Sequence, residues 1–144
     1  MPDNLTIEQR RHTMSRIRSK DTQPELTVRR LAHARGMRFQ KHKDGLPGRP
    51  DLVFTRAKVV VFVDGDFWHG WQFPRWRAKL APYWRNKIEG NRRRDRRNFQ
   101  SLRRRGWQVL RIWEHDVRRD PASCIDRIES ALRGHSDNSV NGQR

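Results

Sequence analysis

Cysteine and long apolar runs are nearly absent from this chain. Cys124 is the one cysteine among 144 residues, which excludes an intrachain disulfide and a zinc site built from several thiolates. No apolar run approaches the roughly 20 residues that span a bilayer, and the polar N-terminus lacks the apolar segment of a signal peptide. These absences predict a cytoplasmic protein with no membrane partner.

Acidic residues are also scarce. The chain has 16 Asp and Glu against 33 Lys and Arg, for a formal net charge of +17, and 33% of its residues are hydrophobic. This composition predicts one compact domain with a small core and a polyanionic partner. The six tryptophans lie among the basic residues, which suits phosphate contact combined with base stacking. We therefore expect a nucleic-acid partner and a nucleoid-associated location, with a merely solvated charged surface as the alternative.

The hydrophobic pattern predicts an α/β fold. A capping box of Thr22 and Glu25 begins a helix that ends at Gly36. Strands are expected at 37–42 (an edge strand), 51–54, 58–63 and 107–113, and helices at 83–105 and from residue 120 onward. This order predicts a mixed central β-sheet flanked by helices.

The two ends of the chain differ from its middle. Residues 6–19 have helical spacing, but their apolar stripe is too thin for a core helix, so residues 1–20 are predicted to be an arm that contacts DNA. Residues 134–144 are polar and are predicted to be a disordered tail. Residues 21–133 remain as the folded domain.

One face of the predicted helix 83–105 changes character in its middle. The positions that share this face are Trp84, Ile88, Asn91, Asp95, Phe99 and Leu102. The stripe is apolar at both ends, and an unpartnered carboxylate there would cost several kcal/mol. Asp95 is therefore expected to have a partner or to border a polar cleft.

Carboxylates flank the two central strands. Asp51 begins one strand and Asp64 ends the next, so a tight hairpin would bring them together at one end. Two carboxylates in a protein that binds polyanions indicate a Mg²⁺ site for phosphodiester hydrolysis. The alternative is that each is an ordinary turn residue, Asp51 after Pro50 and Asp64 before Gly65.

His69 follows five residues after Asp64 and is the candidate general base, because its unperturbed pKa of about 6.5 suits proton transfer. Asp95 would orient it. The alternative is a hydrogen-bonded structural histidine.

Several motifs carry a family resemblance. Pro50-Asp51, a spacer and an acidic residue ending an apolar strand resemble the PD-(D/E)xK restriction-endonuclease-like core, although Asp66 stands where a lysine is expected. The segments LPGRPDLVF, VDGDFWHG, YWRNKIEGNRRRDRRN and GWQVLRIWEHDV together resemble the very-short-patch repair (Vsr) DNA mismatch endonucleases, from about Arg10 to Arg119.

The resemblance implies an enzyme that nicks double-stranded DNA 5′ to the T of a T:G mismatch left by deamination of 5-methylcytosine, using Mg²⁺. It implies metal ligation by Asp51, the Val63 carbonyl and Asp64, and it makes 21–133 the endonuclease domain. His69 would be the base and Asp95 its partner. Glu25 would lie near the metal, through water, besides or instead of its capping role.

Further residues match family positions that contact DNA. They are Met14, Phe67, Trp68, Trp84, Lys87 and Asn91. The aromatic residues would wedge into the duplex beside the mismatch, which costs least at a weakly paired site. For Phe67 and Trp68 the alternative is ordinary core packing.

One departure concerns a structural zinc that many members hold. The corresponding positions here are Asp66, Trp71, Phe73 and His115, so zinc is predicted to be absent. The change leaves room for a related nicking nuclease of altered specificity in restriction or phage defence, and a catalytically inactive DNA-binding module is a further alternative. A monomer is expected, with other repair proteins as further partners.

Overall fold

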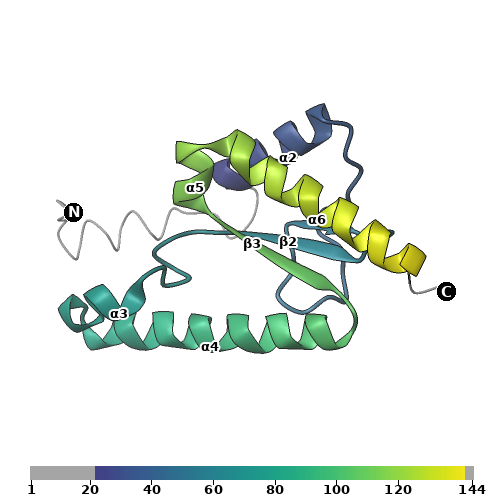
Figure 1. Cartoon of the computed structure of the whole chain (residues 1–144). Coiled ribbons are helices and arrows are strands. Elements are labelled where there is room, and N and C mark those ends of the chain that lie inside the picture. The colour runs from purple at the N-terminus through teal and green to yellow at the C-terminus, as the bar shows by residue number, and fades with distance from the viewer. Residues whose placement is uncertain (1–21, 142–144) are drawn as a thin grey trace.

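A three-stranded sheet lies between two layers of helices (Figure 1). The structure is a computed structural model that describes residues 22–141, with side chains described for 22–134. Strand β1 (Leu52–Phe54) pairs antiparallel with β2 (Val59–Asp64), and β2 pairs parallel with β3 (Gln108–Trp113). The predicted α/β class with a mixed central sheet is confirmed.

Strand β2 is buried on both of its faces. All six of its residues are buried, which explains why its sequence is a continuous apolar run rather than an alternating one. Val59, Val61 and Val63 belong to the core cluster on one side of the sheet, and Val60 and Phe62 belong to the cluster on the other side. Asp64, the last residue of β2, is thereby carried to the rim of a rigid core.

Three helices cover the first face of the sheet: α2 (Gln23–Ala34), α5 (Glu114–Arg119) and α6 (Pro121–Asn141) (Figure 1). They contribute the buried side chains Val28, Ala32, Val117, Cys124, Ile125 and Ile128. Thr22 caps α2 through its side-chain oxygen, which accepts a hydrogen bond from the backbone N–H of Glu25.

The long helix α4 (Pro82–Arg104) covers the other face (Figure 1). Its first residue is proline. Proline lacks a backbone N–H, but no hydrogen bond is lost there, because an N–H at the first position of a helix has no partner within the helix. The predicted stripe is confirmed, because Trp84, Ile88, Phe99 and Leu102 are buried. Asp95 is half-buried in the middle of that stripe and faces the candidate site.

Some predicted elements differ from the observed ones. Residues 37–42 do not form a strand, and their one ladder contact is an isolated bridge between Gln40 and Val53. Met37 still enters the core, but His42 adopts a left-handed φ of 57° that turns the chain away from the sheet. The prediction of an edge strand there was wrong.

Short helices were not predicted from the sequence. Helix α3 (Phe73–Trp76), the 3₁₀ turn η1 (Arg77–Lys79) and α5 are each six residues or shorter, too short for a clear helical period. Helix α6 is described to Asn141 and so runs beyond residue 133, where the sequence predicts a tail.

The predicted N-terminal arm lies outside the described residues. Among the described helices, none combines the length and the apolar character that crossing a membrane requires.

Candidate active site

The hairpin of β1 and β2 brings Asp51 against the end of β2. The backbone N–H of Asp51 donates to the carbonyl of Val61 at 2.8 Å, and its carboxylate Oδ2 accepts the backbone N–H of Val63 at 2.6 Å. Asp64 follows Val63 directly, and its charge is close enough to raise the pKa of Asp51. The two carboxylates therefore occupy the same end of the hairpin, as the strand pattern predicts.

Helix α2 adds a buried ion pair to this end of the sheet. The residues Glu25 and Arg29 are 3% and 7% exposed, and Arg29 Nη2 lies 3.4 Å from Glu25 Oε2. Arg29 Nε and Nη2 also donate to the carbonyl oxygen of Asp51, at 3.3 and 3.2 Å. Arg29 was not singled out in the sequence, although a charged pair four residues apart on a buried helix face is a signal for such a role.

The electrostatics at Asp51 favour a bound cation. Burial, followed by the negative charge of Glu25, raises the pKa of Asp51 to about 8. The Val63 hydrogen bond and the Arg29 charge act in the opposite direction without cancelling this rise. Two close, desolvated carboxylates such as those of Asp51 and Asp64 can both be ionised near neutral pH when a bound cation adds positive charge between them. The carboxylate oxygens at this end of the hairpin therefore fit a divalent metal.

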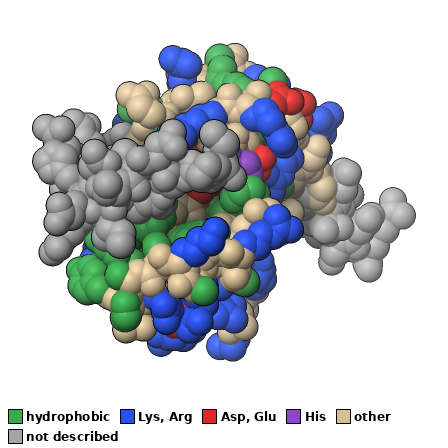
Figure 2. Space-filling model, turned by 90° about the vertical axis from the view of Figure 1, so that its left-hand side faces the viewer, with side chains coloured by type: hydrophobic (Ala, Val, Ile, Leu, Met, Phe, Trp, Pro, Cys, Tyr) green, Lys and Arg blue, Asp and Glu red, His purple; other side chains and the backbone are tan. Residues whose placement is uncertain are grey.

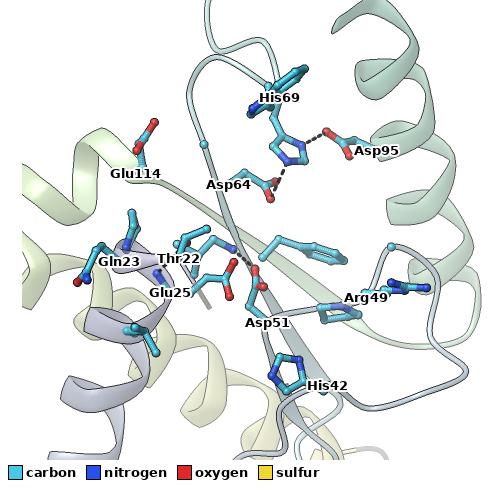
Figure 3. A pocket seen from close by; sticks show the side chains of 18 of the residues that line it. Thr22, Gln23, Glu25, His42, Arg49, Asp51, Asp64, His69, Asp95 and Glu114 are labelled. Atoms are coloured by element: carbon cyan, nitrogen blue, oxygen red, sulfur yellow. Dashed lines mark hydrogen bonds and ion pairs between the residues drawn. The ribbon is translucent and has the colours of Figure 1, made fainter. Parts of the chain in front are cut away.

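His69 and Asp95 meet across the cleft. His69 Nδ1 lies 2.7 Å from Asp95 Oδ2, and His69 Nε2 lies 3.5 Å from Asp64 Oδ1 (Figure 3). Burial by itself lowers the pKa of His69, but the hydrogen bond to Asp95 and the charge of Asp64 outweigh it, and the net shift is upward. The predicted contact between His69, in the loop after β2, and Asp95, on helix α4, is therefore present.

Arg111 completes this group and was missed from the sequence. It projects from β3, where Nε contacts Asp64 Oδ2 at 2.8 Å and Nη2 contacts Asp95 Oδ2 at 2.7 Å. A lone arginine within the apolar run VLRIW was the available signal. Burial raises the pKa of Asp64, and the charges of His69 and Arg111 offset part of that rise.

A tight loop positions His69. Gly70 has a left-handed φ of 72°, and a Cβ atom there would come within 2.7 Å of Arg92 Cδ and 3.1 Å of Ile88 Cγ2. The His69 backbone N–H donates to the carbonyl of Gly65 at 3.2 Å. Glycine at 70 thus lets the loop lie directly on α4, which holds the imidazole over Asp95.

An aromatic cluster stands beside this loop. Phe67 contacts Trp68, Trp76 and Trp84, with centroid distances of 5.6, 5.6 and 6.2 Å. Trp84 is only 8% exposed, so in this conformation it supports Phe67 and Trp68, which are half-buried. The neighbouring Tyr83 is 61% exposed and was not singled out in the sequence.

Two polar residues of α4 reach the same cluster. Asn91 Nδ2 donates to the carbonyl of Trp68 at 3.0 Å, and Lys87 Nζ lies 5.5 Å from the Trp68 ring centroid. The predicted DNA-contacting residues of the described part therefore gather in one place. Met14 lies outside the described residues.

At the positions for which the sequence resemblance implies zinc ligands in other members, this chain holds a pair of polar side chains packed among aromatic rings. His115 Nδ1 lies 2.7 Å from Asp66 Oδ1, and the His115 ring packs on Trp71 with centroids 4.0 Å apart. Phe73 is 1% exposed and packs edge-on against Trp76. A carboxylate paired with an imidazole thus fastens the loop to α5.

We expect protein purified without added metal to contain no stoichiometric zinc. Structural zinc takes four ligands, and these positions supply one imidazole and one carboxylate. Elemental analysis checks this, with His115→Ala as the control because zinc held at this site would be lost from that variant. One zinc per chain in the wild type, absent from the variant, would contradict the prediction.

A single cleft collects these groups. It has a volume of roughly 1110 Å³, and Asp51, Asp64, His69 and Asp95 are among the residues that line it. Figure 2 shows acidic and histidine side chains in a hollow with basic side chains along its edges. Asp51 and His69 therefore face the same space, which a hydrolytic site requires.

A second donor group in the cleft also has the spacing of a metal site. Within the described residues, Asp64, His69 and Asp95 offer ligand atoms that all lie within 4.8 Å of one another. Carboxylate oxygens and an imidazole nitrogen fit a divalent metal. The triad thus has the spacing of a metal site, but the guanidinium of Arg111 already donates to both of its carboxylates.

The sequence of this chain is similar to those of known DNA endonucleases and nicking enzymes. Residues 2–75 match the family model described as DNA mismatch endonuclease Vsr. The type II nicking enzyme V.XorIIP of Xanthomonas oryzae pv. oryzae (strain KACC10331 / KXO85) is 42% identical over 144 residues, which cover 96% of this chain and 100% of that enzyme. The DNA mismatch endonuclease Vsr of Escherichia coli (strain K12) is 35% identical over 111 residues, 76% of this chain and 71% of the other.

A solved structure supports the fold. The homing endonuclease I-Bth0305I catalytic domain has a TM-score of 0.58 and covers 80% of this chain and 98% of its own, at 18% sequence identity. This likeness to a nuclease domain is consistent with the predicted restriction-endonuclease-like core. The family match and the identities to curated relatives establish that this chain belongs to the Vsr family of DNA mismatch endonucleases.

Proposed function

We propose that this protein is a Mg²⁺-dependent endonuclease that nicks double-stranded DNA 5′ to the T of a T:G mismatch. The observation that carries the proposal is one cleft that contains both the Asp51 carboxylate and the His69–Asp95 pair. Membership of the Vsr family supports the nicking activity, and the net charge of +17 supports a DNA substrate.

Proton transfer is assigned to His69. Asp95 accepts the Nδ1–H of the neutral imidazole, which leaves the Nε2 lone pair free to accept a proton. Nε2 takes that proton from the water that attacks phosphorus, the P–O bond to the leaving sugar oxygen breaks, and that oxygen takes a proton from solvent to become a hydroxyl. The half-buried Asp95 stabilises the imidazolium that forms.

The carboxylates hold the metal in this proposal. Asp51, the Val63 carbonyl and Asp64 would ligate Mg²⁺, and Glu25 would act through a water molecule. When bound, Mg²⁺ offsets charge on the phosphate and lowers the pKa of a bound water.

Mismatch recognition is assigned to the aromatic cluster and its polar neighbours. Phe67 and Trp68, supported by Trp84, would enter the duplex, and Lys87 and Asn91 would lie near the mispaired bases. Insertion costs a few kcal/mol of unstacking, and less at a mispair, so the cost itself favours mismatched sites. Met14 would approach from the minor groove.

We expect nicking of a T:G duplex to be about 10- to 100-fold faster than nicking of the matched T:A duplex. This range corresponds to about 1.4–2.7 kcal/mol of easier unstacking at the mispair. End-labelled duplexes with T:G, U:G or T:A at one position measure it, in Mg²⁺ and in EDTA. His69→Ala is the control for contaminating nucleases.

Equal cutting of all three duplexes would contradict the mismatch assignment. It would favour the second candidate, a nicking enzyme of changed specificity in restriction or phage defence. The relative V.XorIIP, which is named a type II nicking enzyme, supports this candidate. Failure of the wild type to cut any duplex would indicate an inactive DNA-binding module. The bonded arrangement of His69 and Asp95 argues against that module.

The protein is proposed to act as a monomer in the cytoplasm, at the nucleoid, where other repair proteins would complete the repair.

A further inference from the structure

Four side chains form a closed ring of polar contacts in the cleft. His69 Nδ1 and Arg111 Nη2 both contact Asp95 Oδ2, each at 2.7 Å. Arg111 Nε contacts Asp64 Oδ2 at 2.8 Å, and Asp64 Oδ1 faces His69 Nε2 at 3.5 Å. In this ring the two carboxylates alternate with the imidazole of His69 and the guanidinium of Arg111, so each carboxylate contacts both of these groups.

Three members of this ring also have the spacing of a metal site. The ligand atoms of Asp64, His69 and Asp95 lie within 4.8 Å of one another. Arg111 already donates to one oxygen of each carboxylate in this triad. The planar guanidinium presents its donors as a fixed fork, so it can bridge two carboxylates that a metal would otherwise bridge.

Packing fixes Arg111 in this position. The guanidinium carbon lies 5.1 Å from the Phe99 ring centroid and 4.2 Å from that of Trp113. Arg111 side-chain exposure is 24%, and it is not among the described residues that line the cleft. The arginine thus acts behind the cleft wall, through the two carboxylates.

The Asp51 side of the cleft is different. The Asp51 carboxylate accepts a hydrogen bond from the neutral backbone N–H of Val63, and Arg29 directs Nε and Nη2 to the Asp51 carbonyl oxygen. The buried Glu25 adds a second negative charge here. Arg29 is paired with Glu25 at 3.4 Å. A divalent cation at Asp51 therefore meets a carboxylate that accepts a hydrogen bond from a neutral N–H, whereas each carboxylate of the triad already accepts from the Arg111 guanidinium.

We propose that Arg111 is a positioning residue that serves as the resident cation of the Asp64–His69–Asp95 group and keeps divalent metal out of it. Its second effect is to hold Asp95 so that His69 stays oriented toward the cleft. The second effect rests on the proposed function, whereas the exclusion of metal does not.

Cobalt binding without DNA tests the exclusion of metal. We expect wild-type protein titrated with Co²⁺ to bind one ion, lost in Asp51→Ala, with no visible absorption that depends on His69. Arg111→Met is expected to bind a second Co²⁺, whose absorption disappears in the Arg111→Met/His69→Ala double variant. Arg111→Lys keeps the charge and should not gain this ion, and Arg133→Met on α6 is the matched control.

Two results would overturn the proposal. One is a Co²⁺ absorption signal in the wild type that is lost in a His69→Ala protein with a native circular dichroism spectrum. The other is an Arg111→Met protein with a native circular dichroism spectrum that binds no additional Co²⁺.

Nicking kinetics test the positioning role. We expect Arg111→Met and Arg111→Lys to lower kcat about 10- to 100-fold, as is usual for loss of a group that orients a functional side chain. The KM should change less than about threefold, because Arg111 lies behind the cleft wall. In Arg111→Ala, added guanidinium ion should restore part of kcat. A raised KM with normal kcat would contradict the positioning role. A wild type that cuts no duplex would defeat the proposed function alone and leave the cobalt result to decide the metal question.

Discussion

Replacement of Asp51 by asparagine is expected to lower nicking about 100- to 1000-fold and to raise the melting temperature of the metal-free protein at pH 8. The loss of activity corresponds to several kcal/mol of charge compensation on the phosphate. The gain in stability arises because asparagine removes the cost of burying a charge and the repulsion from Glu25, while its side-chain oxygen can still accept the Val63 N–H.

The pH dependence follows from the raised pKa of Asp51. The folded protein keeps the proton up to about pH 8, whereas the unfolded chain releases it near 3.8. Between these values the folded state binds more protons than the unfolded state, so the free energy of unfolding of the metal-free wild type falls as the pH rises. In Asp51→Asn this contribution is absent.

Thermal melts in EDTA between pH 5 and pH 9 measure the effect. We expect Asp51→Asn to exceed the wild type at pH 8 by at least ~1 kcal/mol, or roughly 3–5 °C. Added Mg²⁺ should raise the melting temperature of the wild type and not that of the variant. Asp44→Asn, an exposed residue of the same cleft, is the control. Identical wild-type and Asp51→Asn melts at every pH would refute the electrostatic account of Asp51.

Asp95→Asn is expected to lower kcat about 100- to 10,000-fold, the range seen when a general base loses its function or its correct tautomer. One carboxylate oxygen of Asp95 accepts from both His69 and Arg111, and an amide would remove the negative charge that supports both contacts. Single-turnover nicking of a T:G duplex measures the loss.

DNA binding separates this effect from unfolding. We expect fluorescence anisotropy to give a Kd for Asp95→Asn within about threefold of the wild type, because α4 and the aromatic cluster remain in place. Glu89→Gln is the matched control, since it makes the same chemical change on the same helix outside the cleft lining. Wild-type nicking by Asp95→Asn would contradict the assigned role.

The sequence predicted those parts of the site in which periodicity and chemistry coincide. Residue Asp95 could be placed because a carboxylate interrupts an apolar helical stripe and therefore needs a partner. Asp51 could be placed beside the end of β2 because antiparallel pairing in a hairpin determines which residues of the two strands lie opposite each other. In both cases local spacing determines the contact.

The missed parts depend on contacts between distant segments. Arg111 has no local partner, since its contacts to Asp64 and Asp95 arise from the parallel pairing of β2 with β3. Arg29 likewise reaches a backbone carbonyl 22 positions away. The prediction of an edge strand at 37–42 was wrong for a different reason. The residue pattern allows a strand, but His42 at its end has a left-handed φ, which is incompatible with continued strand geometry.

The aromatic cluster is assembled before any duplex arrives. Phe67 lies nearly parallel to Trp76, with an interplanar angle of 16°, while Trp84 packs edge-on against Phe67 and Asn91 donates to the Trp68 carbonyl. Side chains that are already immobile lose little conformational entropy on binding. On the proposed function, the reorganisation that accompanies recognition would therefore fall on the nucleic acid, and the stiffness of a particular base step would become a quantity that the enzyme can sense.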